Sequence, residues 1–147
     1  MSRDKLASQT EATVLQFLDT AAHLELKLDR ALLNTKGVSF SEYRLLAAIG
    51  ASASRGCSRI KLAQQVGLTP SAVTRALKPL EKLGFVETVR NERDARQSLA
   101  TLTAGGLEML KDAQGIVADV LRDLPLNALG EKKRTEFSSR LKELMTD

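Results

Sequence analysis

The chain has 147 residues, and 43% of them are hydrophobic, so it is long enough to bury the core of one ordinary domain. Aromatic residues make up only 3%, and the abundance of Leu, Ala, Glu, Lys and Arg favours a mostly helical protein. No apolar run approaches the ~18 residues of a membrane span, and the start does not resemble a signal peptide. We therefore expect a cytoplasmic protein with no membrane partner.

The positive charge is concentrated in the middle of the sequence. The formal net charge is +4, but residues 55–96 alone hold nine Lys or Arg against four Asp or Glu. A central basic patch is typical of a protein that binds a polyanion, although an ordinary solvated surface would show the same charge.

Hydrophobic spacing and capping residues predict two helices in the first third of the chain. Apolar residues recur every three or four positions over residues 11–34, which predicts one long amphipathic helix that ends at Gly37. Ser39 and Glu42 match the Ser-x-x-Glu capping box, so a second helix should follow and continue to Ile49.

The next two predicted helices form a helix-turn-helix. Ser58 can cap a short helix that ends at Gly67. Thr69 is a good N-cap, and Pro70 suits the first helical position, where no backbone N–H is needed, so the following helix should run to Gly84. A short helix, a three-residue turn and a second capped helix are the parts of this motif.

A hairpin and two further helices complete the prediction. Residues 85–90 and 97–102 alternate and contain Val, Thr and Phe, which predicts two strands joined by a polar loop. Thr103 can cap another long helix, which Pro125 breaks before a final amphipathic helix. The expected fold class is therefore mainly α with a small β-hairpin wing: a winged helix-turn-helix core flanked by N- and C-terminal dimerisation helices.

The second helix of the motif has one apolar and one polar face. The polar face carries two hydroxyls, a guanidinium and an ammonium, which belong to Ser71, Thr74, Arg75 and Lys78. Hydroxyls and guanidinium groups can hydrogen-bond base edges, and Arg can bind guanine through two hydrogen bonds, so we expect Ser71, Thr74 and Arg75 to read bases. A solvated helix face is the alternative, but residues 69–79 contain no acid to support it.

The polar loop of the predicted hairpin offers a second contact with DNA. Arg93 and Arg96 can reach the minor groove or its phosphates, and Asp94 between them is best interpreted as a local brace that pairs with an Arg or caps the turn. The alternative is a salt-bridged surface turn. The cations expected to contact phosphates are Arg59, Lys78, Lys82 and Arg90.

Short motifs lie along the chain at residues 62–63 and 67 (Leu-Ala and Gly), 71–75 (Ser-Ala-Val-Thr-Arg), 80–86 (Leu-Glu-Lys-Leu-Gly-Phe-Val), 93–96 (Arg-Asp-Ala-Arg) and 102–106 (Leu-Thr-Ala-Gly-Gly). With these motifs the sequence resembles, over nearly its whole length, the MarR family of bacterial regulators. The resemblance implies a homodimer whose paired winged domains bind a palindrome, often released by a small phenolic or aromatic ligand. It would place that ligand near His23, Lys27, Tyr43 and Arg44.

Two residues depart from the family pattern. Asn91 stands where the family often has Asp, which makes one wing contact uncertain. Pro79 lies inside the predicted recognition helix, where it removes the hydrogen bond to the carbonyl of Arg75 and disfavours helix at Lys78, at a cost of ~3 kcal/mol. We expect a kink at this point.

The apolar stripes of the terminal helices predict a dimer. Residues 39–103 suffice for the winged DNA-binding domain, whereas residues 1–38 and 104–147 form a helical dimerisation region whose stripes exceed what so small a core can cover. A C2 dimer would bury them and set two recognition helices ~34 Å apart, about one turn of DNA. A monomeric helical cap is the alternative.

The leading hypothesis is a sequence-specific binder of duplex DNA, expected to act as a homodimeric repressor of a palindromic operator. The alternative is a winged-helix module that binds protein instead of DNA. An enzyme is not expected, because the sequence shows no triad, metal site or phosphate-binding loop, and no cofactor is implied.

The single His and the single Cys can each be interpreted as a structural residue or as a functional one. His23 is more often a surface or packing residue than a ligand, and no metal partners accompany it. Cys57 is expected to be an inert buried thiol, with redox sensing as a hypothesis in which Arg55 and Arg59 lower its pKa.

Overall fold

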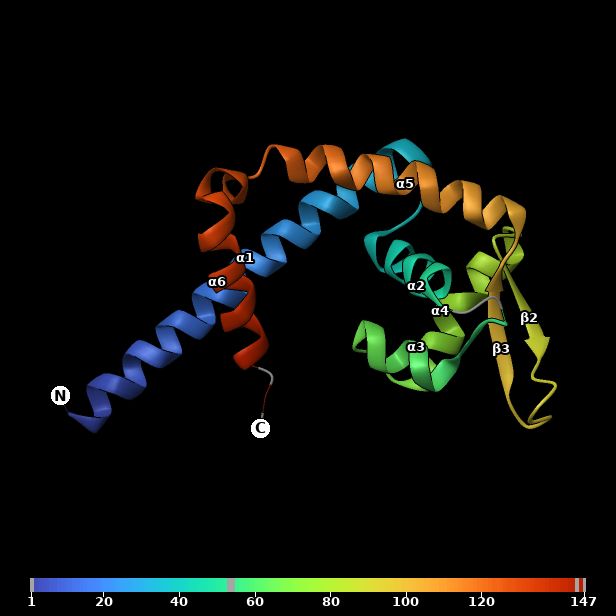
Figure 1. The fold of residues 1–147 in the computed structure, drawn as a ribbon, viewed down its shortest axis with the longest axis horizontal. Coiled ribbons are helices and arrows are strands. Elements are labelled where there is room, and N and C mark those ends of the chain that lie inside the picture. Colours follow the sequence, from blue (N-terminus) through green and yellow to red (C-terminus); the bar gives the residue numbers. More distant parts are fainter. Residues whose placement is uncertain (1, 53–54, 145, 147) are drawn as a thin grey trace.

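The structure is a computed structural model that describes residues 2–52, 55–144 and 146, so parts of the expected terminal dimerisation region (residues 1, 145 and 147) lie outside it, as do residues 53–54. Helices dominate, with a small sheet on one side (Figure 1). The elements are α1 (Arg3–Lys36), α2 (Phe40–Ala51), β1 (Cys57–Ser58), α3 (Arg59–Val66), α4 (Pro70–Lys82), β2 (Val86–Arg90), β3 (Ser98–Leu102), α5 (Ala104–Arg122), the 3-10 helix η1 (Pro125–Leu129) and α6 (Gly130–Glu143).

Four side-chain caps begin the helices where the sequence predicts. Ser39 and Glu42 form the complete capping box of α2. Ser58 accepts from the backbone N–H of Lys61, and Thr69 accepts from that of Ala72. Thr103 caps α5 by accepting from the N–H of Gly106 at 3.0 Å, and its hydroxyl also donates to the carbonyl of Gly84. Local sequence therefore fixes the start of each of these helices.

The first helix is longer than predicted. It begins at Arg3 rather than residue 11 and ends at Lys36, before Gly37 in the left-handed conformation. Residues 3–10 have no apolar stripe from which a helix could be predicted. They contain neither Gly nor Pro, however, so their sequence does not oppose an extension of the helix.

Helix α4 runs through Lys78 and Pro79 to Lys82 without interruption, so Pro79 does not end the helix, and the kink expected there stays a prediction. Pro79 lies close to the C-terminal end, so it removes one hydrogen bond, to the carbonyl of Arg75, while its own carbonyl still accepts from Leu83. The packing of Val73, Leu77 and Leu80, all buried, holds the helix together.

The sheet has three strands in the order β1-β3-β2, all antiparallel. The predicted hairpin is confirmed, with Val86 opposite Leu102 and Arg90 opposite Ser98. Strand β1 was not predicted, because two residues are too few to show alternation. Cys57 of this strand lies opposite Ala100.

Two apolar clusters join the winged part to the long helices. The first fills the space between α2, α3, α4 and the sheet, with Leu45, Leu46, Leu62, Leu77 and Leu80 almost fully buried. The second lies where α1 meets α5, and its buried members are Leu28, Leu32, Val38, Ala113 and Val117. Tyr43, Phe85 and Met109 touch both clusters, so the two parts share a continuous core.

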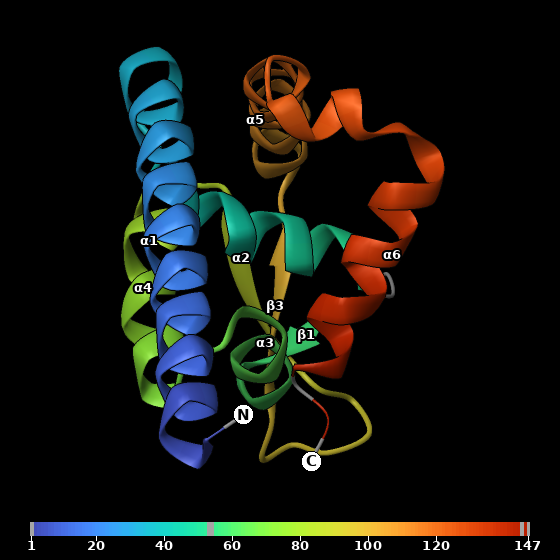
Figure 2. The same ribbon diagram turned by 90° about the vertical axis from the view of Figure 1, so that its left-hand side faces the viewer.

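The ends of the chain project from this core. In Figure 1 the N-terminal half of α1 and all of α6 extend away from α2, α3, α4 and the sheet. Figure 2 shows α1 and α6 on opposite sides of the view, with α2 and α3 between them. No described helix is long and apolar enough to cross a membrane.

Candidate nucleic-acid interface

Helix α4 presents its polar face to solvent. Ser71, Thr74, Arg75 and Lys78 are all exposed, as the two-faced pattern predicts. Among the described residues neither Arg75 nor Lys78 takes part in an ion pair, so both charges are available to an anionic partner. The other face of α4 is buried against the winged core.

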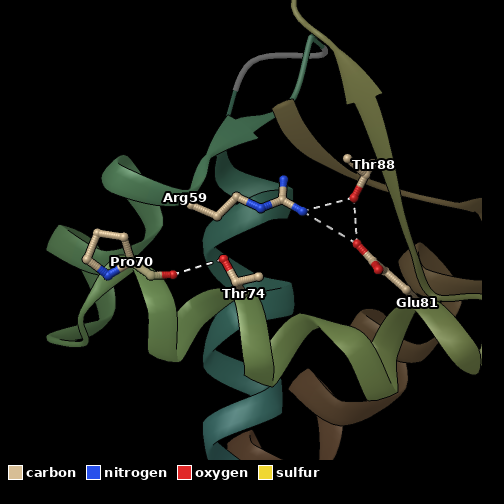
Figure 3. A network of polar contacts seen from close by, with 5 residues as sticks. All are labelled: Arg59, Pro70, Thr74, Glu81 and Thr88. Carbon is tan, nitrogen blue, oxygen red and sulfur yellow. Dashed lines mark hydrogen bonds and ion pairs between the residues drawn. The ribbon is translucent and has the colours of Figure 1, made fainter. Parts of the chain in front are cut away.

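The two hydroxyls on this face are already oriented by the helix. Thr74 Oγ1 donates to the carbonyl of Pro70 at 3.0 Å (Figure 3), and Ser71 Oγ lies 3.3 Å from Thr69 Oγ1. Because its hydrogen is used within α4, the Thr74 hydroxyl turns acceptor lone pairs and its methyl group outward. Thr74 is therefore suited to accept from a base amino group or to contact a thymine methyl.

Short-range polar contacts hold the tip of the wing, and two of them involve the residues singled out from the sequence. Asp94 Oδ1 accepts from the backbone N–H of Arg96 at 3.0 Å, which is the turn-capping form of the expected brace. Asn91 Oδ1 accepts from the N–H of Arg93 at 3.0 Å, an acceptor role that the Asp usual in the family would also fill. Since these contacts use backbone groups, the guanidinium groups of Arg93 and Arg96 remain exposed.

The four cations expected at phosphates do not share one environment. Lys78, Lys82 and Arg90 are exposed. Arg59, by contrast, is half-buried: its Nη2 donates to Thr88 Oγ1 at 2.9 Å and lies 3.6 Å from Glu81 Oε1 (Figure 3). The structure thus places Arg59 in an intramolecular contact and does not bring it together with the exposed cations.

Sequence reasoning missed Arg55 as a member of this surface. With Arg90 and Arg93 it lines a depression of about 210 Å³ at the base of the wing, over Leu99. Its position follows from the pairing of Cys57 with Ala100, which brings residues 55–56 beside the hairpin. No local pattern in the sequence marks that pairing.

Among the cavities formed by the described residues, none of those identified is lined by all four residues expected around a ligand. A cavity of about 430 Å³ lies between α1, α2 and the end of α3, and of the four only Arg44 lines it. Its wall on α1 consists of residues at helical spacing: Ala22, Glu25, Leu26 and Asp29. His23 and Lys27 are shifted by one residue, which turns them about 100° around the helix.

The other three expected ligand residues have separate environments. His23 Nδ1 lies 2.7 Å from the carbonyl oxygen of Asp19, one turn earlier on α1, and Lys27 is exposed. Tyr43 packs between the two apolar clusters and stacks on Phe40 with ring centroids 6.0 Å apart. Burial raises the pKa of its phenol, in keeping with its partly buried position beside both apolar clusters.

The environment of Cys57 also differs from expectation. Its side chain is only 1% exposed. Burial raises the pKa of the thiol, and the charge of Lys61 and the hydroxyl of Ser52 offset this only in part. The expected lowering by Arg55 and Arg59 is therefore wrong, and this buried thiol lacks the thiolate character that redox sensing requires.

Metal coordination has no structural basis in the part of the chain that is described, because it contains no group of three or more His, Cys, Asp or Glu residues that could hold an ion. The exposed features that remain are a hydroxyl- and cation-bearing helix face and an arginine-tipped hairpin on the same winged core. Both features present exposed cations, which suits them to bind a polyanion.

Known proteins share both the sequence and the fold. The sequence pattern of the MarR family matches residues 36–97. An HTH-type transcriptional repressor of Mycobacterium tuberculosis is 31% identical over 117 residues, which cover 80% of this chain and 82% of that protein. The HTH-type transcriptional regulator BilQ of Clostridium symbiosum is 28% identical over 112 residues, 76% of each chain.

Two solved structures extend the similarity to three dimensions. A MarR family transcriptional regulator from Streptomyces coelicolor, in complex with DNA, has a TM-score of 0.85 and 25% identity, covering 93% of this chain and 86% of that one. A MarR/EmrR family regulator from Acinetobacter sp. ADP1 has a TM-score of 0.80 and 25% identity, covering 98% and 95%. With sequence and fold in agreement, the chain belongs to the MarR family of helix-turn-helix transcriptional regulators, not to a class of enzymes.

Proposed function

We propose that the chain is a homodimeric repressor that binds a palindromic operator in duplex DNA. The observation that carries this proposal is the exposed polar face of α4, which presents Ser71, Thr74, Arg75 and Lys78. Within α4, no acidic residue comes before Glu81. A helix of this kind enters the major groove in helix-turn-helix proteins. The DNA complex of the Streptomyces coelicolor regulator and the repressor name of the mycobacterial relative support the same role.

Each exposed group has a distinct part in this proposal. Ser71, Thr74 and Arg75 read base edges in the major groove, while Arg93 and Arg96 reach the minor groove from the wing. The phosphate contacts come from Lys78, Lys82 and Arg90. Arg55, which lies beside the wing, is a fourth cation in position to contact a phosphate. Binding to DNA would also place the protein in the compartment that holds the genome, the cytoplasm of a bacterial cell.

Exposed apolar side chains support the homodimer. On the projecting half of α1, Leu6, Leu15 and Leu18 are each more than half exposed, and Phe17 is 42% exposed. On η1 and α6, Leu129 is 40% and Phe137 is 46% exposed. A second copy related by twofold symmetry would cover both regions and would give two α4 helices spaced for the halves of a palindrome.

The cavity between α1, α2 and α3 is the best candidate for an effector site. Leu26, Phe40 and Val66 provide an apolar wall. The charged lining residues are the cation Arg44 and the acids Glu25 and Asp29, and Asp29 Oδ1 already accepts from the Phe40 N–H. A volume of about 430 Å³ is within the range of small-molecule pockets. A small aromatic acid or phenol would place its ring on the wall and its oxygen near Arg44.

The first experiment selects a duplex from a randomised library with the wild-type protein and compares it with a scrambled duplex at several salt concentrations. A dimer that prefers a selected palindrome by about a thousandfold or more would support the proposal. Equal, weak binding to both duplexes would contradict it and would favour a winged-helix module that binds protein. Sedimentation of the same samples gives the oligomeric state.

A further inference from the structure

Three polar side chains connect the recognition helix to the wing. Arg59 is the first residue of α3, Glu81 lies in the last turn of α4, and Thr88 is the middle residue of β2. Arg59 Nη2 contacts both partners, and the Thr88 hydroxyl donates to the same Glu81 oxygen, Oε1. Figure 3 shows the resulting closed triangle.

The triangle is shielded from solvent on the side of its cation. The side chain of Arg59 is 18% exposed and that of Glu81 is 35% exposed, so water screens this pair less than it screens a surface ion pair. Arg59 Nη1 is buried with no hydrogen-bond partner among the described residues. The partly buried guanidinium of Arg59 has little contact with water. Its planar donors therefore favour the one orientation that reaches both Glu81 and Thr88.

The position of Glu81 on α4 gives the ion pair a further consequence. Thr74, Lys78 and Glu81 follow the spacing of one helical stripe, so the carboxylate continues the exposed polar face toward its C-terminal end. An unpaired carboxylate on this stripe would repel the phosphates that Lys78 is proposed to contact. Arg59 neutralises that charge within the protein.

The same contact is a tie between two DNA-facing elements. Among the described residues no other side-chain hydrogen bond connects α4 with β2 or β3. The backbone link is the turn after α4, where the N–H of Phe85 donates to the carbonyl of Leu80. Without Thr88, the hairpin would be attached to α4 by this turn and by apolar packing alone.

We propose that the Arg59–Glu81–Thr88 triangle fixes the wing relative to the recognition helix, with Thr88 as the positioning residue that places Arg93 and Arg96 on the DNA. This inference rests on the proposed binding to DNA. It assigns Arg59 to the inside of the protein, in place of the phosphate contact expected from the sequence. Because Thr88 carries no charge, its role can be tested without changing the electrostatic attraction to DNA.

The test compares Thr88→Val, which keeps the shape and removes the hydroxyl, with Thr88→Ser, which keeps the hydroxyl. The probe is the duplex that the wild-type protein selects from a randomised library. We expect Thr88→Val to weaken binding about threefold to tenfold, and Thr88→Ser to bind like wild type. Thr101→Val on the neighbouring strand is the matched control, since no hydrogen bond of its hydroxyl is found among the described residues.

A double-mutant comparison separates positioning from a direct contact. In a chain that already carries Arg93→Ala and Arg96→Ala, Thr88→Val should have little further effect, because the side chains it positions are gone. Full persistence of the Thr88→Val loss in that background would overturn the proposal, as would equal binding by Thr88→Val and Thr88→Ser.

A second measurement does not depend on DNA. Hydrogen exchange of the β2 and β3 amides in the free protein should be faster in Thr88→Val than in Thr88→Ser, because the hairpin loses its tie to α4. If wild type selects no duplex but this difference is found, the DNA-binding proposal fails while the triangle still holds the wing. Identical exchange in the two variants would overturn the triangle itself.

Discussion

At the scale of single residues, the exposed cations of the winged core differ in what they can recognise. Arg75 lies in the second turn of α4 beside two hydroxyls, where its planar donors can match the acceptors of guanine. Lys82 is the last residue of α4 and carries a point charge on a flexible stem. A guanidinium in the groove can distinguish bases, whereas an ammonium near the backbone attracts any phosphate.

This difference predicts opposite patterns for two substitutions. Arg75→Ala should reduce the preference for the selected palindrome over a scrambled duplex by about 1–3 kcal/mol, roughly fivefold to 150-fold. Lys82→Ala should weaken binding to both duplexes alike and reduce the slope of log affinity against log salt concentration by about 0.9. Titrations by fluorescence anisotropy at several salt concentrations measure both quantities. The same loss on both duplexes for Arg75→Ala would contradict its assignment to base reading.

The buried thiol predicts a pH dependence of stability. Because burial raises the pKa of Cys57, the thiol stays protonated in the folded chain at pH values where the unfolded chain has begun to ionise. The unfolded state then binds fewer protons, so the free energy of unfolding is unaffected by this group at neutral pH and falls as the pH rises above about 8.5. Urea unfolding of wild type and Cys57→Ala at about pH 7 and about pH 9.5 tests this. An equal fall in both proteins would show that other groups cause it.

At the scale of elements, helix α5 depends on a close approach that only glycine permits. A Cβ on Gly106 would lie 1.9 Å from the carbonyl oxygen of Phe85, which is far inside van der Waals contact. Gly115 lies on the same helix, and a Cβ there would meet nothing within 4 Å. Both glycines therefore lie within the same helix, but only Gly106 leaves no space for a side chain.

This pair gives a matched prediction for stability. Gly115→Ala should raise the free energy of unfolding by about 0.5–1 kcal/mol, because Ala has the higher helix propensity. Gly106→Ala should lower it by about 1–3 kcal/mol, because α5 must move away from the start of β2. Denaturant unfolding followed by circular dichroism measures both. Stabilisation by Gly106→Ala would show that the junction adjusts more freely than its geometry indicates.

The proline in α4 predicts a stability gain. Pro79 is exposed and leaves the carbonyl of Arg75 without its helical donor. Pro79→Ala should therefore raise the free energy of unfolding by about 1–2 kcal/mol, less than the full helix penalty because the unfolded chain regains freedom. Thermal unfolding of the variant checks the sign. A loss of stability would mean that Pro79 contributes a contact that outweighs the missing hydrogen bond.

The elements that the sequence predicts well are those with local causes. Ser39, Ser58, Thr69 and Thr103 cap helices through backbone groups three residues away, so their patterns can be found by eye. Strand β1 and the Arg59–Glu81 contact join residues more than twenty positions apart. The family resemblance supplied the fold, but it could not show that Tyr43 packs against both apolar clusters, because those contacts join separate parts of the chain.

At the scale of the whole molecule, the apolar surface of the projecting helices is the basis of the proposed dimer. Phe17 on α1 and Phe137 on α6 are 42% and 46% exposed. The N-terminal half of α1 and the whole of α6 extend away from the winged core (Figure 1). Single exposed hydrophobic residues are normal, but exposed apolar side chains that recur along both projecting helices indicate a surface that a partner covers. The proposed partner is a second copy of this chain.

The dimer predicts what charged substitutions at these positions do. Wild type should sediment at twice the 16.0 kDa of one chain. Phe17→Glu and Phe137→Glu should shift the population to monomers, because a buried unpaired carboxylate is strongly unfavourable. Leu83→Glu is the control, since Leu83 is 58% exposed but lies at the end of α4 on the winged core. A monomeric wild type, or variants that remain dimers, would contradict the assembly.

The junction between the wing and α5 makes that helix a lever. One residue, Thr103, separates β3 from α5, and its hydroxyl is bonded to both Gly84 and Gly106 while its N–H donates to Phe85. Because this joint is one residue long and is held by three hydrogen bonds, the orientation of the hairpin is tied to that of α5. The long arm of the lever packs against α1 through Ala113 and Val117, and the short arm bears the wing. A small tilt imposed on the long arm would therefore displace the arginines at the wing tip, which gives the molecule a mechanical route from its apolar ends to its DNA-facing surface.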